Sequence, residues 1–182
     1  MTEVPKNRQR TFGRWTGMAA LAAVLLLAVV PARAQIPHGE TVKADLVVVR
    51  KAARKLELRR AGRVLESYRI ALGWDPDGTK RQEGDGRTPE GVYTLDWRNA
   101  NSSFYRSIHV SYPRAGDDLH AVRWGVSPGG LIMLHGLPNG LQAEEIGHPE
   151  VDWTNGCIAL TNEEIDEIWN RVEDGTTIII YP

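Results

Sequence analysis

Short apolar runs rich in β-branched residues recur from residue 45 onward, and Gly, Pro and charged residues separate them. Runs of this length and composition are typical of strands. They predict strands at 45–50, 55–60, 63–72, 92–95, 108–112, 131–134 and 177–181, with a hairpin turn at Ala61-Gly62. The pattern therefore predicts a single, mainly β domain, arranged as a β-sandwich or a partly closed sheet.

One segment has a clear helical pattern. Thr161 and Glu164 form a capping-box pair, which marks a helix N-terminus. One apolar stripe follows, made of Ile165, Ile168, Trp169 and Val172. Gly175 is the expected end of this helix. We therefore expect one or two short helices beside the sheet.

The N-terminus has a composition of its own. Residues 1–34 hold five basic residues and one acidic residue, and the run from Met18 to Val30 is apolar. Ala32-Arg33-Ala34 then provides the small residues that a signal peptidase recognises, so we expect a secretory signal peptide at 1–34. The alternative is an uncleaved anchor, since the 18 uncharged residues from Trp15 to Ala32 barely suffice to span a bilayer. No cysteine lies near this segment, which excludes a lipoprotein anchor.

Cleavage after Ala34 would leave a short lead at 35–41 and a domain at 42–182. The mature part would carry 17 basic and 22 acidic residues. An acidic balance of this kind argues against nucleic acid as a partner, because phosphate binding needs a basic surface. Contact with the membrane is expected only through the N-terminal segment, if that segment stays attached.

Cys157 is the single cysteine of the chain, so it cannot close an internal disulfide. It is either a small buried residue or a reactive thiol. Gly156 before it favours the second interpretation, because glycine permits a sharp turn and a close approach of substrate. Backbone N–H groups at such a turn can also stabilise an oxyanion.

A cysteine nucleophile needs a base, and the chain has five histidines. His135 ends an apolar strand and precedes Gly136, which suits a residue at the edge of a cleft. His148 before Pro149 is the alternative base, in what we expect to be a mobile polar loop. The remaining three are expected in a lead segment, a strand and a solvated loop: His38, His109 and His120.

The spacing of cysteine and histidine does not match a zinc site, and no phosphate-binding glycine loop of the Walker type is present. We therefore expect neither a metal nor another cofactor. The long connection from Gly73 to Gly91 is expected to be functional, since loops of this length are uncommon in compact domains.

Several motifs in one order resemble the YkuD-type L,D-transpeptidases, and in particular their YafK-like branch. They are His135-Gly136, Thr154-Asn155-Gly156-Cys157, the segment 84–93 (GDGRTPEGVY), Ser111-Tyr112-Pro113 and Asp152-Trp153-Thr154. The resemblance covers about 42–182.

This resemblance implies a catalytic domain of the periplasm or cell envelope that acts on peptidoglycan peptide stems. Cys157 would attack the carbonyl between an L-configured centre and a D-residue, with His135 as base and then acid. An amine of another stem, a lipoprotein lysine or water would resolve the acyl-enzyme. Gly156 and Thr154 would shape the turn and the oxyanion site, and Gly136 would orient the histidine.

Two positions depart from the family pattern. Many members have His where this chain has Asn155, and Arg where it has Ala159. A cation at the second position could bind a stem carboxylate, so its absence brings hydrolysis into consideration as the reaction. The candidate replacement cations are Arg87, Lys80 and Arg123.

Two other interpretations remain open. A sortase-like enzyme also uses His, Cys and Arg in this chain order, and Arg171 could supply the arginine, but Arg171 falls within the capped helix. A wall-binding module without turnover would bind peptidoglycan and carry an unreactive thiol. In an enzyme, Cys157 would be expected to react with electrophiles faster than a free thiol near pH 6–7.

Overall fold

The computed structural model describes Met1 and residues 41–182. The predicted signal peptide, the lead segment up to residue 40 and His38 lie outside this range. Among the described residues, no helix is both long enough and apolar enough to cross a bilayer.

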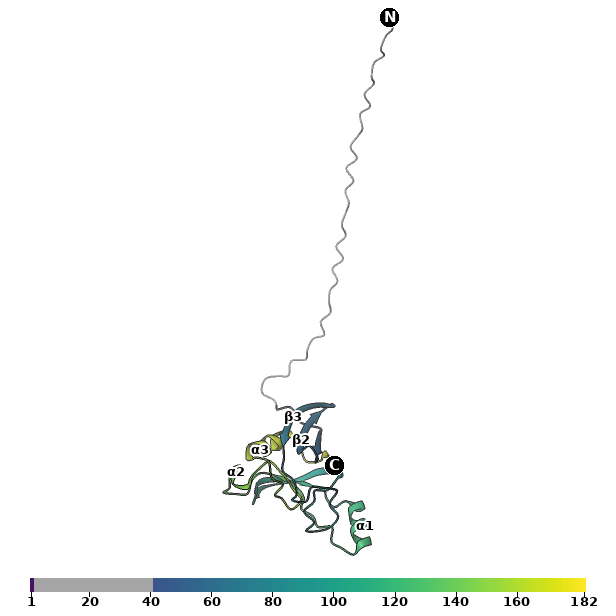
Figure 1. The fold of residues 1–182 in the computed structure, drawn as a ribbon, viewed down its shortest axis with the longest axis vertical. Helices are drawn as coiled ribbons and strands as arrows, with labels where there is room; N and C mark the ends of the chain where they lie inside the picture. Colours follow the sequence, from purple (N-terminus) through teal and green to yellow (C-terminus); the bar gives the residue numbers. More distant parts are fainter. Residues whose placement is uncertain (2–40) are drawn as a thin grey trace. The chain divides into compact units, whose positions relative to one another are not determined.

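One curled sheet of eight strands forms the body of residues 41–182 (Figure 1). The strands are β1 (Leu46–Arg50), β2 (Lys55–Arg60), β3 (Arg63–Arg69), β4 (Gly91–Ser102), β5 (Tyr105–Val110), β6 (Met133–His135), β7 (Ile158–Ala159) and β8 (Thr176–Tyr181). Their order across the sheet is β3-β2-β1-β8-β4-β5-β6-β7. The pairs β1–β8 and β6–β7 are parallel, and the others are antiparallel. The prediction of a mainly β domain with a partly closed sheet is confirmed.

The chain after β3 links the two ends of the sheet. The sequence pattern predicted a strand as far as Leu72, but pairing with β2 stops at Arg69. Ala71 instead pairs with Ala159 of β7, and Gly73 pairs with Thr154. The edge of β3 and the edge of β7 are thereby brought together, which partly closes the sheet.

The core fills the inside of this curl. Side chains of β1 and β8 alternate, and Val47, Val49, Ile178 and Ile180 are buried beside each other. Burying aliphatic side chains of this size is worth roughly 1.5–3 kcal/mol each, so these central strands hold much of the stability.

Three helices lie among the described residues: α1 (Ala115–Trp124), α2 (Ala143–Ile146) and α3 (Asn162–Arg171). In α3 the Thr161 hydroxyl accepts the Glu164 N–H, as predicted, and Ile165 and Ile168 pack into the core. The helix ends at Arg171 and not at Gly175, because Val172 is extended and Gly175 (φ +93°) forms the turn into β8.

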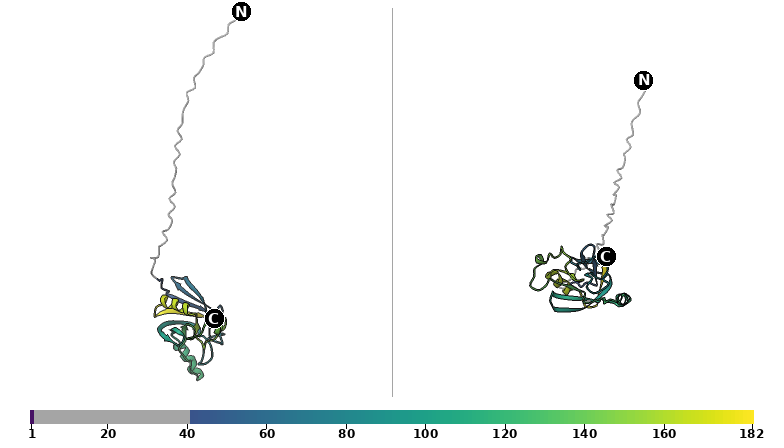
Figure 2. Two further views of the ribbon diagram at one scale, coloured as in Figure 1. Left: turned by 90° about the vertical axis from the view of Figure 1, so that its left-hand side faces the viewer. Right: turned by 60° about the horizontal axis from the view of Figure 1, so that its bottom comes forward.

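The pattern of apolar residues did not predict α1. Its one buried residue is Ala121, while Leu119 and Val122 are 71% and 77% exposed. A helix without a buried stripe gives no helical periodicity to detect. Both Figure 1 and Figure 2 show α1 projecting from the body, on the far side from α3.

The long connection from Gly73 to Gly91 is fastened by a buried lysine. Lys51, 2% exposed, bonds the Gly78 carbonyl, the Thr88 carbonyl (3.0 Å) and the Glu90 carboxylate (2.7 Å). A buried ammonium needs such partners, because an unpaired one would carry a large desolvation cost. Lys51 therefore attaches this loop to the end of β1.

Replacing Lys51 with Met should destabilise the fold by roughly 3 kcal/mol, because the partners of a buried charge lose their bonds. Chemical denaturation would measure the difference. Lys55→Met is the matched control, since Lys55 is 43% exposed in its pair with Glu57 and should cost less than about 1 kcal/mol. Equal losses for the two variants would contradict the anchoring role of Lys51.

Candidate active site

His135 is the last residue of β6. It pairs with Ser107 of β5 on one side and with Ala159 of β7 on the other. The preceding Leu134 pairs with Ile158, and both are fully buried on the opposite, core-facing side. Alternation along β6 then directs His135 away from the main core, on the same side as Met133.

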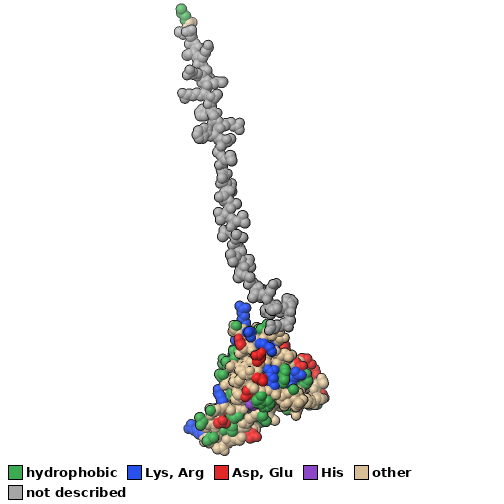
Figure 3. All heavy atoms as spheres, turned by 180° about the vertical axis from the view of Figure 1, so that it is seen from behind, with side chains coloured by type: hydrophobic (Ala, Val, Ile, Leu, Met, Phe, Trp, Pro, Cys, Tyr) green, Lys and Arg blue, Asp and Glu red, His purple; other side chains and the backbone are tan. Residues whose placement is uncertain are grey.

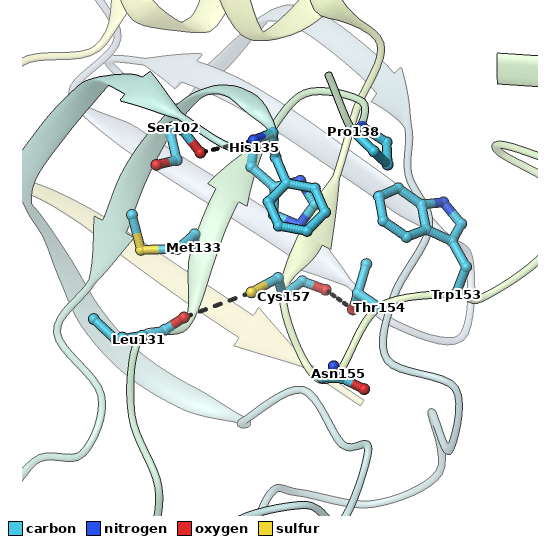
Figure 4. Close-up of a pocket in the computed structure, with 11 residues that line it drawn as sticks. Ser102, Leu131, Met133, His135, Pro138, Trp153, Thr154, Asn155 and Cys157 are labelled. Atoms are coloured by element: carbon cyan, nitrogen blue, oxygen red, sulfur yellow. Dashed lines mark hydrogen bonds between the residues drawn. The ribbon is translucent and has the colours of Figure 1, made fainter. Parts of the chain in front are cut away.

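Cys157 lies immediately before β7, and the same alternation puts it on the face of Ala159 and His135. This face lines a cavity of about 380 Å³ (Figure 4). Its lining residues are Ser102, Phe104, Ser107, Leu131, Met133, His135, Pro138, Trp153, Thr154, Asn155 and Cys157. The structure thus brings the two predicted catalytic residues to one pocket from two adjacent parallel strands.

The backbone fixes the tautomer of His135. Its Nδ1 lies 2.7 Å from the carbonyl oxygen of Gly136. A carbonyl only accepts, so Nδ1 carries the proton of the neutral ring and Nε2 keeps a free lone pair. Gly136 is closely enclosed, since a Cβ there would lie 2.6 Å from Asn162 Oδ1.

The surroundings of His135 keep its ring uncharged. The side chain is 3% exposed, and burial lowers its pKa from 6.5 to about 4. Two aromatic rings contribute to this enclosure: Phe104 at 4.7 Å and Trp153 at 5.5 Å between ring centroids. At neutral pH His135 is therefore a neutral imidazole, able to accept a proton.

The thiol of Cys157 is uncharged as well. Burial raises its pKa, and this outweighs the Met133 N–H and the positive charge of Lys80, which favour the thiolate. Its sulfur lies 3.6 Å from the Leu131 carbonyl, as Figure 4 shows, which suits a thiol that donates a hydrogen bond. Of the two protonation patterns open to a Cys–His pair, the structure favours thiol plus imidazole.

This state changes the expectation for the free thiol. From the sequence alone, Cys157 was expected to react quickly with electrophiles near neutral pH. A thiol with a raised pKa holds little thiolate there, so general alkylating reagents should label it slowly. Rapid labelling is therefore not the test that separates an enzyme from a binding module.

Thr154 holds the turn that presents Cys157. Its Oγ1 accepts the Gly156 N–H at 3.1 Å and donates to the Cys157 carbonyl at 2.8 Å. Gly156 has φ +123°, and a Cβ there would lie 2.5 Å from the Arg87 carbonyl oxygen. Because the Gly156 N–H is already bonded, an oxyanion at this turn would need another donor.

A second anchor precedes the turn. Asp152 receives Nε and Nη2 of Arg54 and also the backbone N–H of Leu72 at 2.9 Å. It therefore ties the segment before Cys157 to the chain that closes the sheet. Asp152 belongs to a motif of the sequence, but Arg54, about 100 positions earlier, gives no local signal of this partnership.

The departures from the family pattern have different structural outcomes. Asn155 lines the cavity, whereas Ala159 is fully buried between β6 and the paired Ala71. None of the three proposed replacement cations lines the cavity. Arg87 pairs with Asp75 (3.0 Å) and buried Lys80 with Asp85 (2.8 Å), while Arg123 is exposed on α1.

The other histidines have their own partners. His148 is buried, not in a mobile polar loop as expected, and its Nδ1 accepts the Trp153 indole N–H at 3.4 Å. His109 bonds Asp96, and His120 lies on α1 and not in a loop. Arg171 pairs with Glu167 within α3, away from the cavity lining, which does not fit a sortase-like role.

The cavity wall includes residues that the sequence analysis did not single out, namely Ser102, Phe104, Met133 and Pro138. They come from the β4–β5 hairpin, β6 and the segment after it, and only the fold assembles them. Among residues 41–182 no cluster of three His, Cys, Asp or Glu side chains is arranged to hold a metal ion.

Comparison with known families gives one match over most of the chain. The family model for the YkuD L,D-transpeptidase catalytic domain matches residues 44–180. The protein named "Putative L,D-transpeptidase YafK" of Escherichia coli (strain K12) is 30% identical over 129 residues. The match covers 65% of this chain and 44% of that relative, so this chain corresponds to less than half of its length.

Solved structures show the same fold. The helical cell shape determining protein Pgp2 from Campylobacter jejuni superposes with a TM-score of 0.58 at 26% identity, over 74% of this chain and 46% of that one. Bdellovibrio bacteriovorus Bd1075 superposes with a TM-score of 0.54 at 23% identity, over 77% and 48%.

Removal of the Thr154 hydroxyl should disturb the turn that carries Cys157. Thr154→Val keeps the shape but leaves the Gly156 N–H and the Cys157 carbonyl without this partner, at a cost of roughly 2 kcal/mol. The free energy of unfolding and kcat would both be measured, and both should be lower than in the parent protein. Thr154→Ser is the matched control, because it keeps the hydroxyl, and it should stay near the parent protein. If Val and Ser behave alike, the hydroxyl does not hold the turn.

Proposed function

The chain belongs to the L,D-transpeptidase catalytic domain family, and on that premise we propose that it is a cysteine-nucleophile transpeptidase acting on peptidoglycan peptide stems. The observation that supports this most strongly is the shared cavity of Cys157 and His135. Their side chains face one enclosed space from neighbouring strands, and the free Nε2 of His135 is the base that a protonated thiol requires.

In the first half of the reaction, the thiol proton moves to Nε2 of His135 as the sulfur attacks the substrate carbonyl. A bond from sulfur to carbon forms, and the carbon–nitrogen bond of the amide breaks. The imidazolium returns its proton to the departing amine of the D-residue. The Gly136 carbonyl stabilises this imidazolium, since it accepts from the opposite ring nitrogen.

In the second half, an amine of another stem attacks the thioester. Nε2 of His135 takes the proton of this amine, a new amide forms, and the sulfur leaves and regains its proton. A lysine of a wall-linked lipoprotein carries the same nucleophile and is a further acceptor of this kind. The cell-shape role stated in the name of Pgp2 fits an enzyme that remodels the wall.

Hydrolysis of the acyl-enzyme is the second candidate outcome. The observation in its favour is Ala159, because a buried methyl group stands where many members carry arginine. If the site binds the amine acceptor less tightly, a larger share of the thioester reacts with water. The same enzyme would then release shortened stems or detach a linked lipoprotein.

Export belongs to this proposal, because the proposed substrate lies outside the cytoplasmic membrane. The leader, the apolar run and Ala32-Arg33-Ala34 support a mature chain that begins near Gln35 in the periplasm. N-terminal sequencing of the protein from the envelope fraction would test this, and an intact Met1 start would contradict it.

Incubation with purified muropeptides should yield an acyl-enzyme whose mass equals that of the protein plus the stem minus the free D-amino acid that leaves. Cys157→Ala should form no adduct and no product, while its thermal unfolding stays close to that of the parent. Mass analysis of the products separates the two outcomes, because transfer joins two stems whereas hydrolysis adds water to one. Turnover retained in Cys157→Ala would exclude the proposed nucleophile.

His135→Ala should slow acylation by roughly two to four orders of magnitude, the usual worth of a positioned acid–base group. In the parent protein the acidic limb of the rate should lie near pH 4, because below that pH the His135 ring is already protonated and can no longer accept the thiol proton. His109→Ala is the control, since His109 bonds Asp96 and does not line the cavity. His148→Ala should slow acylation less than His135→Ala does. If His148→Ala slows it more, His148 is the base.

The same titration has a consequence for stability. The pKa of His135 is lower in the folded state than in the unfolded state, so only the unfolded chain binds a proton between about pH 6.5 and pH 4. The neutral ring contributes fully to the free energy of unfolding above about pH 6.5. This contribution is lost as the pH falls from about 6.5 to about 4. The loss amounts to roughly 3 kcal/mol.

A further inference from the structure

A cavity of about 400 Å³ lies beside α1, outside the candidate active site. Arg81 and Gln82 form one wall, from the long loop, and His120 and Trp124 form the other, from α1. Val126, just after the helix, completes the lining. We refer to these five residues as the α1 cleft.

The Arg81 side chain contacts a histidine, but its positive charge is not balanced by a carboxylate among the described residues. Its Nη1 lies 3.1 Å from Nε2 of His120. A guanidinium only donates, so His120 accepts this bond with its neutral ring and adds no negative charge. No carboxylate lies within ion-pair distance of Arg81 among residues 41–182. The remaining N–H groups of Arg81 therefore carry a positive charge that has no acidic partner.

Asp85, an acidic residue of the same loop, is already engaged. Asp85 receives the backbone N–H groups of Arg81 (2.7 Å) and Gln82 (3.1 Å) and the ammonium of Lys80 (2.8 Å). These bonds fix the backbone from which Arg81 projects. The backbone N–H of Glu83 also donates to the Ser127 carbonyl (2.8 Å), which connects this loop to the chain just after α1. The cation is thus presented by an ordered loop.

The opposite wall supplies an apolar surface. Trp124 is 69% exposed, and its ring lies 6.2 Å from that of His120. The projecting end of the molecule in Figure 3, which corresponds to α1, shows hydrophobic side chains at its surface. A fixed arginine facing an exposed indole suits a ligand that has a carboxylate beside an apolar group.

The α1 cleft is connected to the catalytic turn through its own loop. The Arg87 carbonyl lies against Gly156, and Gly86 lies against Gly73, so the loop that carries Arg81 also packs on the segment before Cys157. A ligand bound to Arg81 would therefore be held by a loop that packs against the turn of the proposed nucleophile.

We propose that the α1 cleft binds the free carboxylate of a peptide stem, with Arg81 as the cation and Trp124 as the apolar surface. This proposal rests on the proposed function and deepens it. The cleft would supply a cation for the stem carboxylate, which the buried and uncharged Ala159 cannot do.

The test is an NMR titration of the protein carrying Cys157→Ala, which prevents turnover. The probe is an N-acetylated L-lysyl-D-alanyl-D-alanine peptide with a free carboxylate, and its C-terminal amide is the comparison ligand. The indole N–H signal of Trp124 and the Nε–H signal of Arg81 should shift with the acid and not with the amide. Arg81→Gln should weaken this binding about tenfold or more, since a charge-assisted hydrogen bond is lost.

Arg123→Gln is the matched control, because it removes one exposed charge from the same helix without altering the cleft lining. It should leave the affinity unchanged within about twofold. With Cys157 intact, Arg81→Gln should raise KM and leave kcat near the parent value. Absence of shifts at Trp124 and Arg81, or equal weakening by Arg81→Gln and Arg123→Gln, would overturn the proposal.

Binding and chemistry can fail separately in this design. If the shifts appear but no acyl-enzyme forms on Cys157, the cleft is a peptide-binding site and the proposed reaction is wrong. If acylation proceeds while the two signals stay fixed, the reaction stands and the cleft does not recognise the stem.

Discussion

The backbone pairing of residues 70–73 with residues 154–159 closes the sheet and fixes the place of Cys157. Ala71 and Ala159 exchange two hydrogen bonds, of 3.1 and 2.9 Å, and the Thr154 N–H donates to the Leu72 carbonyl at 3.0 Å. Gly73 permits this approach, because a Cβ there would lie 2.0 Å from the Gly86 carbonyl oxygen. The turn that carries Cys157 is thereby built into the sheet, which gives its geometry the rigidity that the proposed catalysis requires.

Two buried lysines extend this constraint to the long loop. Within the segment between Gly73 and Gly91, Lys51 bonds a carboxylate and two backbone carbonyls, and Lys80 bonds a carboxylate and one backbone carbonyl. Their burial is tolerated because every ammonium has several partners, and removal of one partner leaves the others uncompensated. The loop therefore acts as a firm wall between the catalytic turn and the α1 cleft, although its Gly and Pro content alone would suggest flexibility.

The sequence predicted those parts of the structure that leave a local pattern. The β-branched runs of β1 and β8 and the capping box of α3 are of this kind, and all three elements are present. The second half of β4 and the whole of α1 were missed, because they bury few side chains and so show no periodicity. His148 was misplaced for a related reason, since its burial beside Trp153 depends on contacts that its neighbours Gly147 and Pro149 do not reveal.

In the candidate site, too, some features could be predicted from local motifs and others depend on the fold. The motifs identified Cys157 and His135, and the fold brings them to one cavity, but no motif could reveal that both are uncharged. That property follows from burial, with the Phe104 and Trp153 rings beside His135 and the Leu131 carbonyl beside the Cys157 sulfur, and these groups are brought together only in three dimensions.

An uncharged pair has a consequence for a protein with one cysteine and, as we propose, an extracytoplasmic location. A permanent thiolate would be exposed there to oxidants and to exchange with other disulfides, since the thiolate is the reactive form. Burial keeps Cys157 protonated, and burial also keeps the His135 ring neutral at rest. In the reaction that we propose, charge then develops only when a substrate carbonyl enters the cavity and is attacked by the sulfur as the thiol proton leaves. The apolar lining would thus protect the proposed nucleophile at rest, and it would make the transfer of the thiol proton to His135 part of the attack itself.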